Sequence, residues 1–326
     1  MGRLARTLFG ISDDEVSFER RGFRGADEPQ REHLETVGGS FVTGYRAGLA
    51  EDRLEALATR LDAVASDFRG FAYEGAAMAL TLRDALRPWR KRVPAYLAGP
   101  AAAHTYLAHV GVGWALARLP GGPERHAARM DRVLGWLVLD GYGFHHGFFG
   151  WPRAVSRQIV PPGLGAYARR VFDQGLGRSL WFVEGAGVER IAGTIAAFAP
   201  VRRSDLWSGV GLACAYAGGV PRTAVESLRT LAGRDQPALA QGAAFAALAR
   251  VAADNVAPWT ELACEVLCGG TAAETAALAN GVGARLSDDD RTPSKYELWR
   301  RGVQELLAEK GGTACSEPAA LSIATR

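Results

Sequence analysis

The spacing of apolar residues along the chain is that of helices, and strand-like alternation is scarce. Over residues 54–64, for example, leucines and a valine recur at steps of three and four, which is the stripe of an amphipathic helix. Short turns rich in glycine and proline separate the helical segments. The pattern predicts an all-α protein of stacked αα-hairpins, in which neighbouring hairpins bury a continuous core.

Two stretches of the predicted helices resemble each other, since Gly111–Ala117 returns as Gly209–Ala215. Two further pairs of segments match more loosely, in the same order and at a similar separation. Matches that keep the same order and a constant separation, here roughly 100 residues, are typical of a duplicated unit. We therefore predict two pseudo-repeats of roughly 100 residues, at about 70–150 and 180–255.

The pseudo-repeats are predicted to form a single helical domain, residues 1–285. Residues 286–326 differ in character, because a charged linker precedes one short amphipathic helix at 296–309. The tail that follows this helix is expected to be disordered.

Glycines inside the predicted helices require an explanation, because each costs about 1 kcal/mol relative to alanine. Gly111 and Gly113 in one helix, and Gly209 and Gly211 in another, form sets of small residues. Such a set either lets two helices pack closely or lets a flat ligand lie against the backbone. The sequence leaves both interpretations open.

The composition is that of an ordinary globular protein, with 48% hydrophobic and 22% charged residues. The net charge of +3 is too small to favour nucleic-acid binding. No apolar run reaches the ~18 residues of a membrane span, and the N-terminus lacks the features of a secretory signal. The four cysteines lack the spacing of zinc or redox sites, and no disulfides are expected. Without disulfides, a secretory signal or a membrane span, the chain is expected to be cytoplasmic.

A basic turn that includes two prolines contains Arg87, Arg90, Lys91 and Arg92. It is interpreted either as a solvated loop or as a patch that contacts an anion or a membrane surface.

The segment 140–150 has the highest density of candidate functional groups, because it combines a carboxylate, a phenol and two imidazoles with four glycines. A histidine near a carboxylate is suited to general acid–base catalysis. We assign candidate catalytic roles to Asp140, Tyr142 and His145, and to Glu74, a carboxylate in an otherwise apolar helix. The alternative is that these groups are hydrogen-bonded parts of the core.

A second polar segment, 172–184, supplies further candidates, which either bind substrate or form a buried polar network. The candidate substrate-binding residues are two tryptophans and three polar residues: Trp114, Trp181, Asp173, Gln174 and Arg178. Six polar residues are expected to converge in one cavity, because buried polar groups are costly unless paired or used: Glu74, Asp140, Tyr142, His145, Asp173 and Arg178. The sequence has no nucleotide-binding loop and no recognisable set of metal ligands, so no cofactor and no metal are expected.

Five long segments together carry a family resemblance: Phe71–Leu80, His109–Arg118, Leu139–His145, Phe172–Gly185 and Leu206–Gly218. In this order they resemble the UnbL family, a domain of unknown function found in bacterial enediyne gene clusters. The resemblance extends over about residues 8–267 and leaves the C-terminal tail outside. It supplies no established catalytic residues.

The resemblance implies a role in forming or maturing an enediyne core from a polyketide-derived polyene. It also implies UnbV-like proteins and UnbU-like membrane proteins as partners, and through the latter a peripheral association with the membrane. Two classes of function follow: a pathway enzyme that acts on a polyene or polyyne, or a non-catalytic scaffold that presents a hydrophobic intermediate to partner enzymes.

In the enzyme hypothesis, His145 transfers a proton, Asp140 orients His145, and Arg178 holds an anionic or polar end of the substrate. Side chains alone do not supply the electrons of a redox step. An oxidative step is therefore expected to require the UnbV-like and UnbU-like partners.

Overall fold

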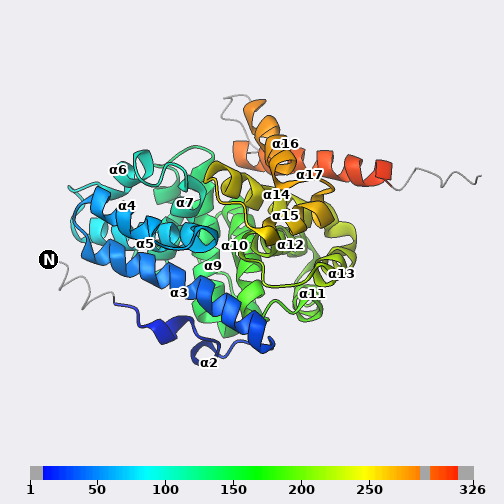
Figure 1. Cartoon of the computed structure of the whole chain (residues 1–326), viewed down its shortest axis with the longest axis horizontal. Coiled ribbons are helices and arrows are strands. Elements are labelled where there is room, and N and C mark those ends of the chain that lie inside the picture. The colour runs from blue at the N-terminus through cyan, green and yellow to red at the C-terminus, as the bar shows by residue number, and fades with distance from the viewer. Residues whose placement is uncertain (1–9, 287–293, 315–326) are drawn as a thin grey trace, which may run out of the picture.

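The structure, a computed structural model, describes residues 10–286 and 294–314, with side chains up to residue 310. Within these ranges the chain is built of helices and contains no strand (Figure 1). The all-α prediction is therefore confirmed.

Long helices form a row in which each packs on the next. They are α3 (Glu28–Ala50), α5 (Ser66–Leu86), α7 (Thr105–Leu116), α9 (Leu137–Trp151), α10 (Ala166–Val183), α12 (Pro200–Ala217) and α14 (Gln236–Ala252). The chain ends in α16 (Ala272–Ala284) and α17 (Lys295–Ala314), both of which pack on α14.

Shorter helices follow individual members of the row along the chain: α4 (Leu54–Asp62), α6 (Arg92–Ala98), α8 (Pro123–Ala127), α11 (Val188–Ala196), α13 (Arg222–Ala232) and α15 (Pro258–Cys268). Of these, α11 packs on α13 and α13 packs on α15, so they form a second layer. Single turns complete the described chain: η1 (Asp13–Val16), α2 (Phe18–Arg21), η2 (Leu134–Trp136), η3 (Pro152–Ser156) and η4 (Gly233–Asp235).

Glycines occupy the points where neighbouring helices of the row touch. A Cβ atom added to Gly177 of α10 would collide with the carbonyl oxygen of Leu206 in α12. One added to Gly209 of α12 would collide with the carbonyl oxygen of Gln174 in α10. The same reciprocal contact joins α3 to α5, α7 to α9, α9 to α10 and α12 to α14. Because only glycine permits so close an approach of two backbones, these residues set the spacing of the row.

The two glycines of each helix face different neighbours, which explains the similarity seen in the sequence. Gly111 of α7 faces α5 and Gly113 faces α9, just as Gly209 of α12 faces α10 and Gly211 faces α14. The same Gly-x-Gly pair occurs in α9 and α10, so the pattern returns at intervals of 30 or 34 residues. Close helix packing therefore accounts for the small residues. The structure does not show two pseudo-repeats of about 100 residues, and the duplication stays a prediction.

The row curves back, so that its first helices contact its last ones. His33 Nε2 of α3 lies 2.6 Å from the carbonyl oxygen of Ala217 at the end of α12. The ring of Phe71 in α5 packs edge-on against Tyr216 of α12, with centroids 5.1 Å apart. Arg250 of α14 donates a hydrogen bond to the backbone carbonyl oxygen of Asp67 in α5. One face of each long helix is thereby turned towards a common interior.

The C-terminal helix α17 belongs to the same core, although the sequence placed its segment outside the helical domain. Tyr296, Trp299, Val303 and Leu307 form a buried stripe at helical spacing and pack with the core of the row. The charged linker and the disordered tail predicted around this helix lie largely outside the described residues.

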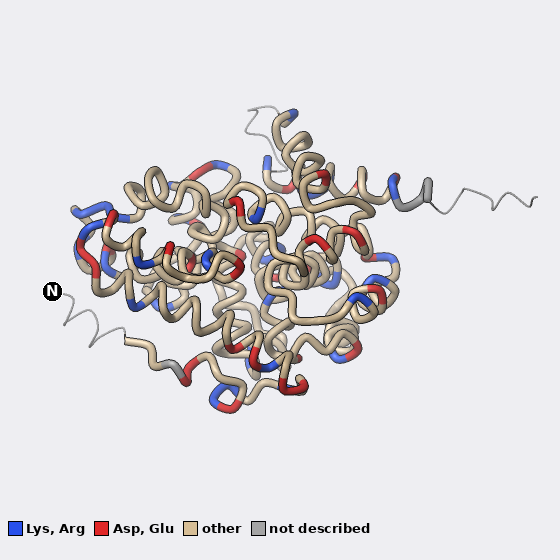
Figure 2. Tube along the Cα trace, viewed as in Figure 1, with Lys and Arg blue, Asp and Glu red and all other residues tan. Residues whose placement is uncertain are grey.

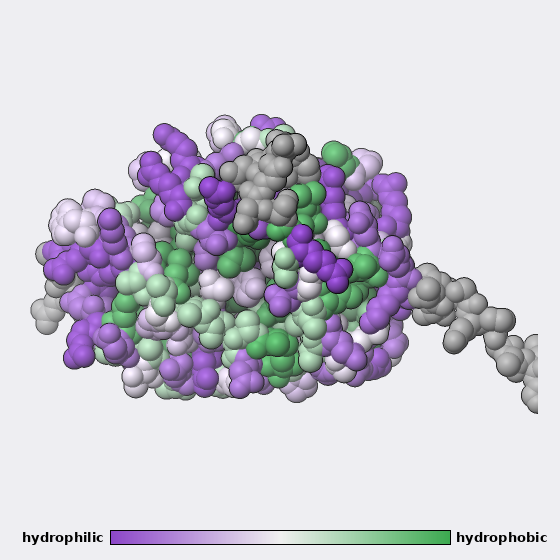
Figure 3. Space-filling view, turned by 90° about the horizontal axis from the view of Figure 1, so that it is seen from above, coloured by the Kyte–Doolittle hydropathy of each residue, from purple (hydrophilic) through white to green (hydrophobic). Residues whose placement is uncertain are grey.

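No single helix in the described part of the chain is both long and apolar enough to cross a membrane. Only α15 and α16 taken as a pair reach that length and composition, and they are bent by 64° relative to each other. On the face shown in Figure 3, hydrophobic residues form separate groups among hydrophilic ones.

Candidate functional site

Five of the predicted site residues meet in the interior of the row: Glu74 of α5, Trp114 of α7, Asp140 of α9, and Gln174 and Arg178 of α10. We call them the central cluster. Each is buried, with at most 4% of its surface exposed. They come together because each lies close to a glycine that brings its helix against the next.

Hydrogen bonds hold the cluster together. Asp140 Oδ1 accepts a hydrogen bond from Arg178 Nη1 at 2.5 Å, and its Oδ2 accepts one from Gln174 Nε2 at 2.7 Å. Trp114 Nε1 donates to Glu74 Oε1 at 3.0 Å. Asp140 is thus ion-paired directly with Arg178. Glu74 accepts a hydrogen bond from the neutral Trp114 and feels the positive charge of Arg178 only at longer range.

The charges of the cluster do not balance when both carboxylates are ionised. Burial raises the pKa of Glu74, the charge of Arg178 opposes this, and the charge of Asp140 adds to it, so that the pKa is about 7. Although burial would lower the pKa of Arg178, the nearby carboxylates raise it above its ordinary value. Near neutral pH, Glu74 is therefore the group of the central cluster that gains and loses a proton.

A narrow cavity of about 30 Å³ reaches the cluster at Arg178. Its other walls are apolar or aromatic and include Tyr216 of α12, Phe245 of α14 and Trp299 of α17. This volume holds about two water molecules. A site for a drug-sized ligand usually has ~300 Å³ or more, so the cavity as it stands does not contain a polyene.

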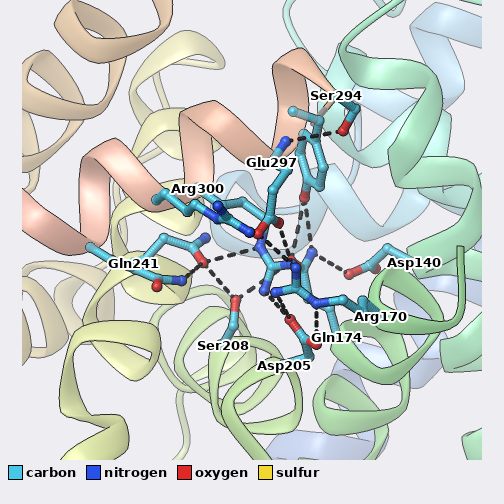
Figure 4. Close-up of polar contacts among 12 residues, drawn as sticks. Asp140, Arg170, Gln174, Asp205, Ser208, Gln241, Ser294, Glu297 and Arg300 are labelled. Atoms are coloured by element: carbon cyan, nitrogen blue, oxygen red, sulfur yellow. Dashed lines mark hydrogen bonds and ion pairs between the residues drawn. The ribbon is translucent and has the colours of Figure 1, made fainter. Parts of the chain in front are cut away.

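A second set of charges, three of them buried and one half-exposed, lies beside the central cluster, where α17 packs on the row (Figure 4). Asp205 of α12 pairs with Arg300 of α17 at 2.7 Å and with Arg170 of α10 at 3.0 Å. Arg170 also pairs with Glu297 of α17 at 2.7 Å. We call these four residues the α17 network. Tyr296 links it to the central cluster, since its hydroxyl accepts a hydrogen bond from Gln174 Nε2 at 3.0 Å.

The sequence reasoning missed the residues of α17. The only available signal was that Arg300 stands within the otherwise apolar stripe of this helix, between Trp299 and Val303. A charge in such a position is buried, and a buried charge needs partners.

His145 of α9 touches the central cluster only through the ring of Trp114 and forms no hydrogen bond with it. Its Nε2 accepts a hydrogen bond from Arg118 Nε at 3.2 Å, and its ring packs against Phe149 and Trp114. Burial, with the charge of Arg118, lowers the pKa of His145 well below its ordinary value. Both oxygens of Asp140 are engaged elsewhere, so the predicted Asp140–His145 pair does not form.

The other predicted residues have separate surroundings. Tyr142 packs edge-on against His146, with ring centroids 4.6 Å apart. Asp173 pairs with Arg202 at 2.5 Å, and Trp181 donates to the carbonyl oxygen of Gly218 at 2.9 Å. Tyr142, Asp173 and His145 are not hydrogen-bonded or ion-paired to the central cluster, so the predicted convergence of six polar side chains in one cavity was wrong.

A larger pocket of about 450 Å³ lies on the surface where α13, α14, α15 and α17 approach one another. The pocket is lined in part by apolar residues, Leu239, Val266, Leu267 and Leu307. Arg229 contributes a charged group to its lining. Its volume is within the usual range for small-molecule sites.

Among the described residues, no three His, Cys, Asp or Glu side chains lie close enough to hold a metal ion. Comparison with known proteins found no curated protein and no solved structure that matches the chain. Residues 1–307, which include the row and most of α17, match a family described as protein of unknown function, DUF1702. The chain therefore belongs to the DUF1702 family.

Proposed function

We propose that this protein takes part in forming or maturing an enediyne core, and that it exchanges a proton with a polyketide-derived polyene or polyyne at Glu74. The pathway rests on the resemblance to the UnbL family. The proton-transfer step rests on one observation, the buried carboxyl whose pKa of about 7 matches the neutral pH of a cell interior.

This proposal moves the proton-transfer role from His145 to Glu74. A general acid or base works best when its pKa lies near the working pH. Glu74 meets that condition, whereas the pKa of His145 lies well below its ordinary value, which leaves this imidazole neutral and weakly basic. Trp114 donates a hydrogen bond to the Glu74 carboxyl, and the positive charge of Arg178 keeps the pKa of this carboxyl from rising further.

Arg178 is the charged side chain that a molecule in the narrow cavity meets first. It would hold an oxygen-bearing end of the intermediate, and the aromatic walls would contact the unsaturated chain. Entry requires the side chains of α17 that line the cavity, Tyr296 and Trp299, to move aside. An oxidative step would draw its electrons from UnbV-like and UnbU-like partners.

A second candidate function is that of a non-catalytic scaffold that carries a hydrophobic intermediate to partner enzymes. The observation that favours it is the surface pocket, which is large enough for such a molecule without any rearrangement. In that case the central cluster would serve only the stability of the interior.

The two functions are separated by substitutions in an enediyne-producing strain, with mass spectrometry of the products. Glu74→Gln keeps the size and the hydrogen-bond acceptor for Trp114 but removes the exchangeable proton. Leu267→Trp instead fills the surface pocket. Protein levels measured by immunoblot control for folding.

If Glu74 transfers a proton, Glu74→Gln lowers the enediyne titre by about 100-fold or more and polyenes accumulate, while Leu267→Trp has little effect. Normal titre in the Glu74→Gln strain with loss of titre in the Leu267→Trp strain would reject proton transfer and support the scaffold.

A further inference from the structure

The loop between α5 and α6 exposes a tryptophan at an end of the molecule. Trp89 is 72% exposed, and Leu86, at the end of α5, is 46% exposed. Tryptophan is the largest apolar side chain and is rarely left in water. Figure 1 shows this loop protruding at the left end of the long axis, next to α6. Neither the central cluster nor the surface pocket involves it.

Positive charge surrounds Trp89. Arg87, Arg90 and Lys91 form no ion pair within the described part of the chain, and Figure 2 shows the tip of this loop in blue. Arg92 is the exception, because Asp84 pairs with it at 3.3 Å. The backbone of Lys91 has a φ of 46°, a left-handed conformation that is uncommon for a residue with a side chain.

The acidic residues at this end of the molecule are already engaged. Asp84 accepts hydrogen bonds from Arg92 and from the backbone of Val93, and Asp52 pairs with the buried Arg83. Glu51 pairs with Arg60 at 2.8 Å. The three unpaired cations of the loop are therefore available to an external anion.

We propose that this loop binds directly to the surface of an anionic lipid bilayer. An indole ring combines an apolar body with a polar N–H group, which suits the boundary between headgroups and acyl chains. Arginine and lysine beside it attract acidic headgroups. The tryptophan favours a bilayer over a nucleic acid, because single-stranded nucleic acids stack on several successive aromatic side chains and Trp89 is the one aromatic residue of this loop, residues 87–91. The contact is with lipid itself and does not require a membrane partner.

The test is sedimentation of the purified protein with phosphatidylcholine vesicles that contain or lack phosphatidylglycerol. Wild-type protein should bind only the anionic vesicles, and high salt should release it. Trp89→Ala should weaken binding about tenfold or more, since it removes the exposed aromatic side chain that would become buried in the bilayer. Arg90→Glu combined with Lys91→Glu should weaken it by at least 25-fold, at about fivefold for each cation lost.

The matched control is Arg157→Glu combined with Arg234→Glu, which makes the same change of charge at two exposed arginines outside the loop and outside both candidate sites. Circular dichroism checks that each variant is folded. Equal binding by the loop variant and the control would overturn the proposal, as would a wild-type protein that ignores the vesicles. Binding to RNA that depends on Arg90 and Lys91, without binding to vesicles, would also overturn it.

Discussion

The central cluster and the α17 network both pair buried carboxylates with arginines, yet the pKa values of one carboxyl in each, Glu74 and Glu297, are shifted in opposite directions. Glu297 is buried, which would raise its pKa, but the hydrogen bond from Arg170 and the charge of Arg300 outweigh burial and lower it. In the central cluster, a single arginine faces two carboxylates, and the pKa of Glu74 rises to about 7.

The difference shows that the number of cationic partners, more than burial itself, decides whether a carboxylate of this interior stays ionised. The α17 network has enough arginines to hold its charges permanently, which suits a helix that is packed in place. The central cluster has two carboxyl groups but one arginine, so one carboxyl, that of Glu74, remains titratable near neutral pH.

The largest expected effect comes from removing the arginine of each region. Arg178→Met leaves Asp140 buried without its charge partner and should lower the free energy of unfolding by about 4 kcal/mol. Arg300→Met should cost about 2 kcal/mol, because Asp205 keeps both hydrogen bonds from Arg170. Urea denaturation of both variants provides the comparison. Equal losses would contradict the difference in partner number.

The pH dependence of stability should differ between the regions. Because the pKa of Glu74 is about 7 in the folded chain and 4.5 ordinarily, folding favours its protonated form. Its contribution, about 3 kcal/mol, is fully present below pH ~4.5 and is lost as the pH rises through 7.

Subtracting the unfolding free energies of Glu74→Gln from those of the wild type, measured over this range, isolates that contribution. Glu297 should behave in the opposite way, since its lowered pKa stabilises the fold above its ordinary value and that stability is lost as the pH falls. The Glu297→Gln difference should therefore grow with rising pH. The same sign for both residues would reject the account.

The two regions also differ in how closely their backbones are packed. A Cβ at Gly175 would collide with the carbonyl oxygen of Asp140, so Gly175→Ala should cost about 2–3 kcal/mol and disturb the central cluster. Gly302 of α17 meets only a side-chain atom of Val282, which can move. Gly302→Ala should therefore change stability by less than ~1 kcal/mol. Thermal denaturation of the two variants tests this contrast, and a tolerated Gly175→Ala would contradict it.

The smallest effect on enediyne production is expected at His145, which is not hydrogen-bonded to either region. His145→Ala removes the hydrogen bond from Arg118 and the ring contacts with Trp114 and Phe149, and should cost about 2 kcal/mol of stability. The enediyne titre of a producing strain should be unchanged. A titre that falls as far as with Glu74→Gln would return the proton-transfer role to this histidine.

The sequence predicted the helical class and the residues of the central cluster, for a physical reason. Glu74 and Asp140 are carboxylates in apolar helices beside glycines, and such groups must meet partners in the interior. The Asp140–His145 pair was wrong, because positions five apart on a helix point about 140° away from each other and the partners of Asp140 come from α10. The α17 network was missed because its pairs join residues up to 127 positions apart.

The measurement that tests the central claim most directly is an infrared titration of the Glu74 carboxyl, with Glu74→Gln as the reference. The account predicts a protonated-carboxyl band that is present near pH 5, disappears with a midpoint of about 7, and is absent from the variant. A Glu74 that is already ionised at pH 5 would contradict the account, because the interior would then hold no group that exchanges protons near neutrality.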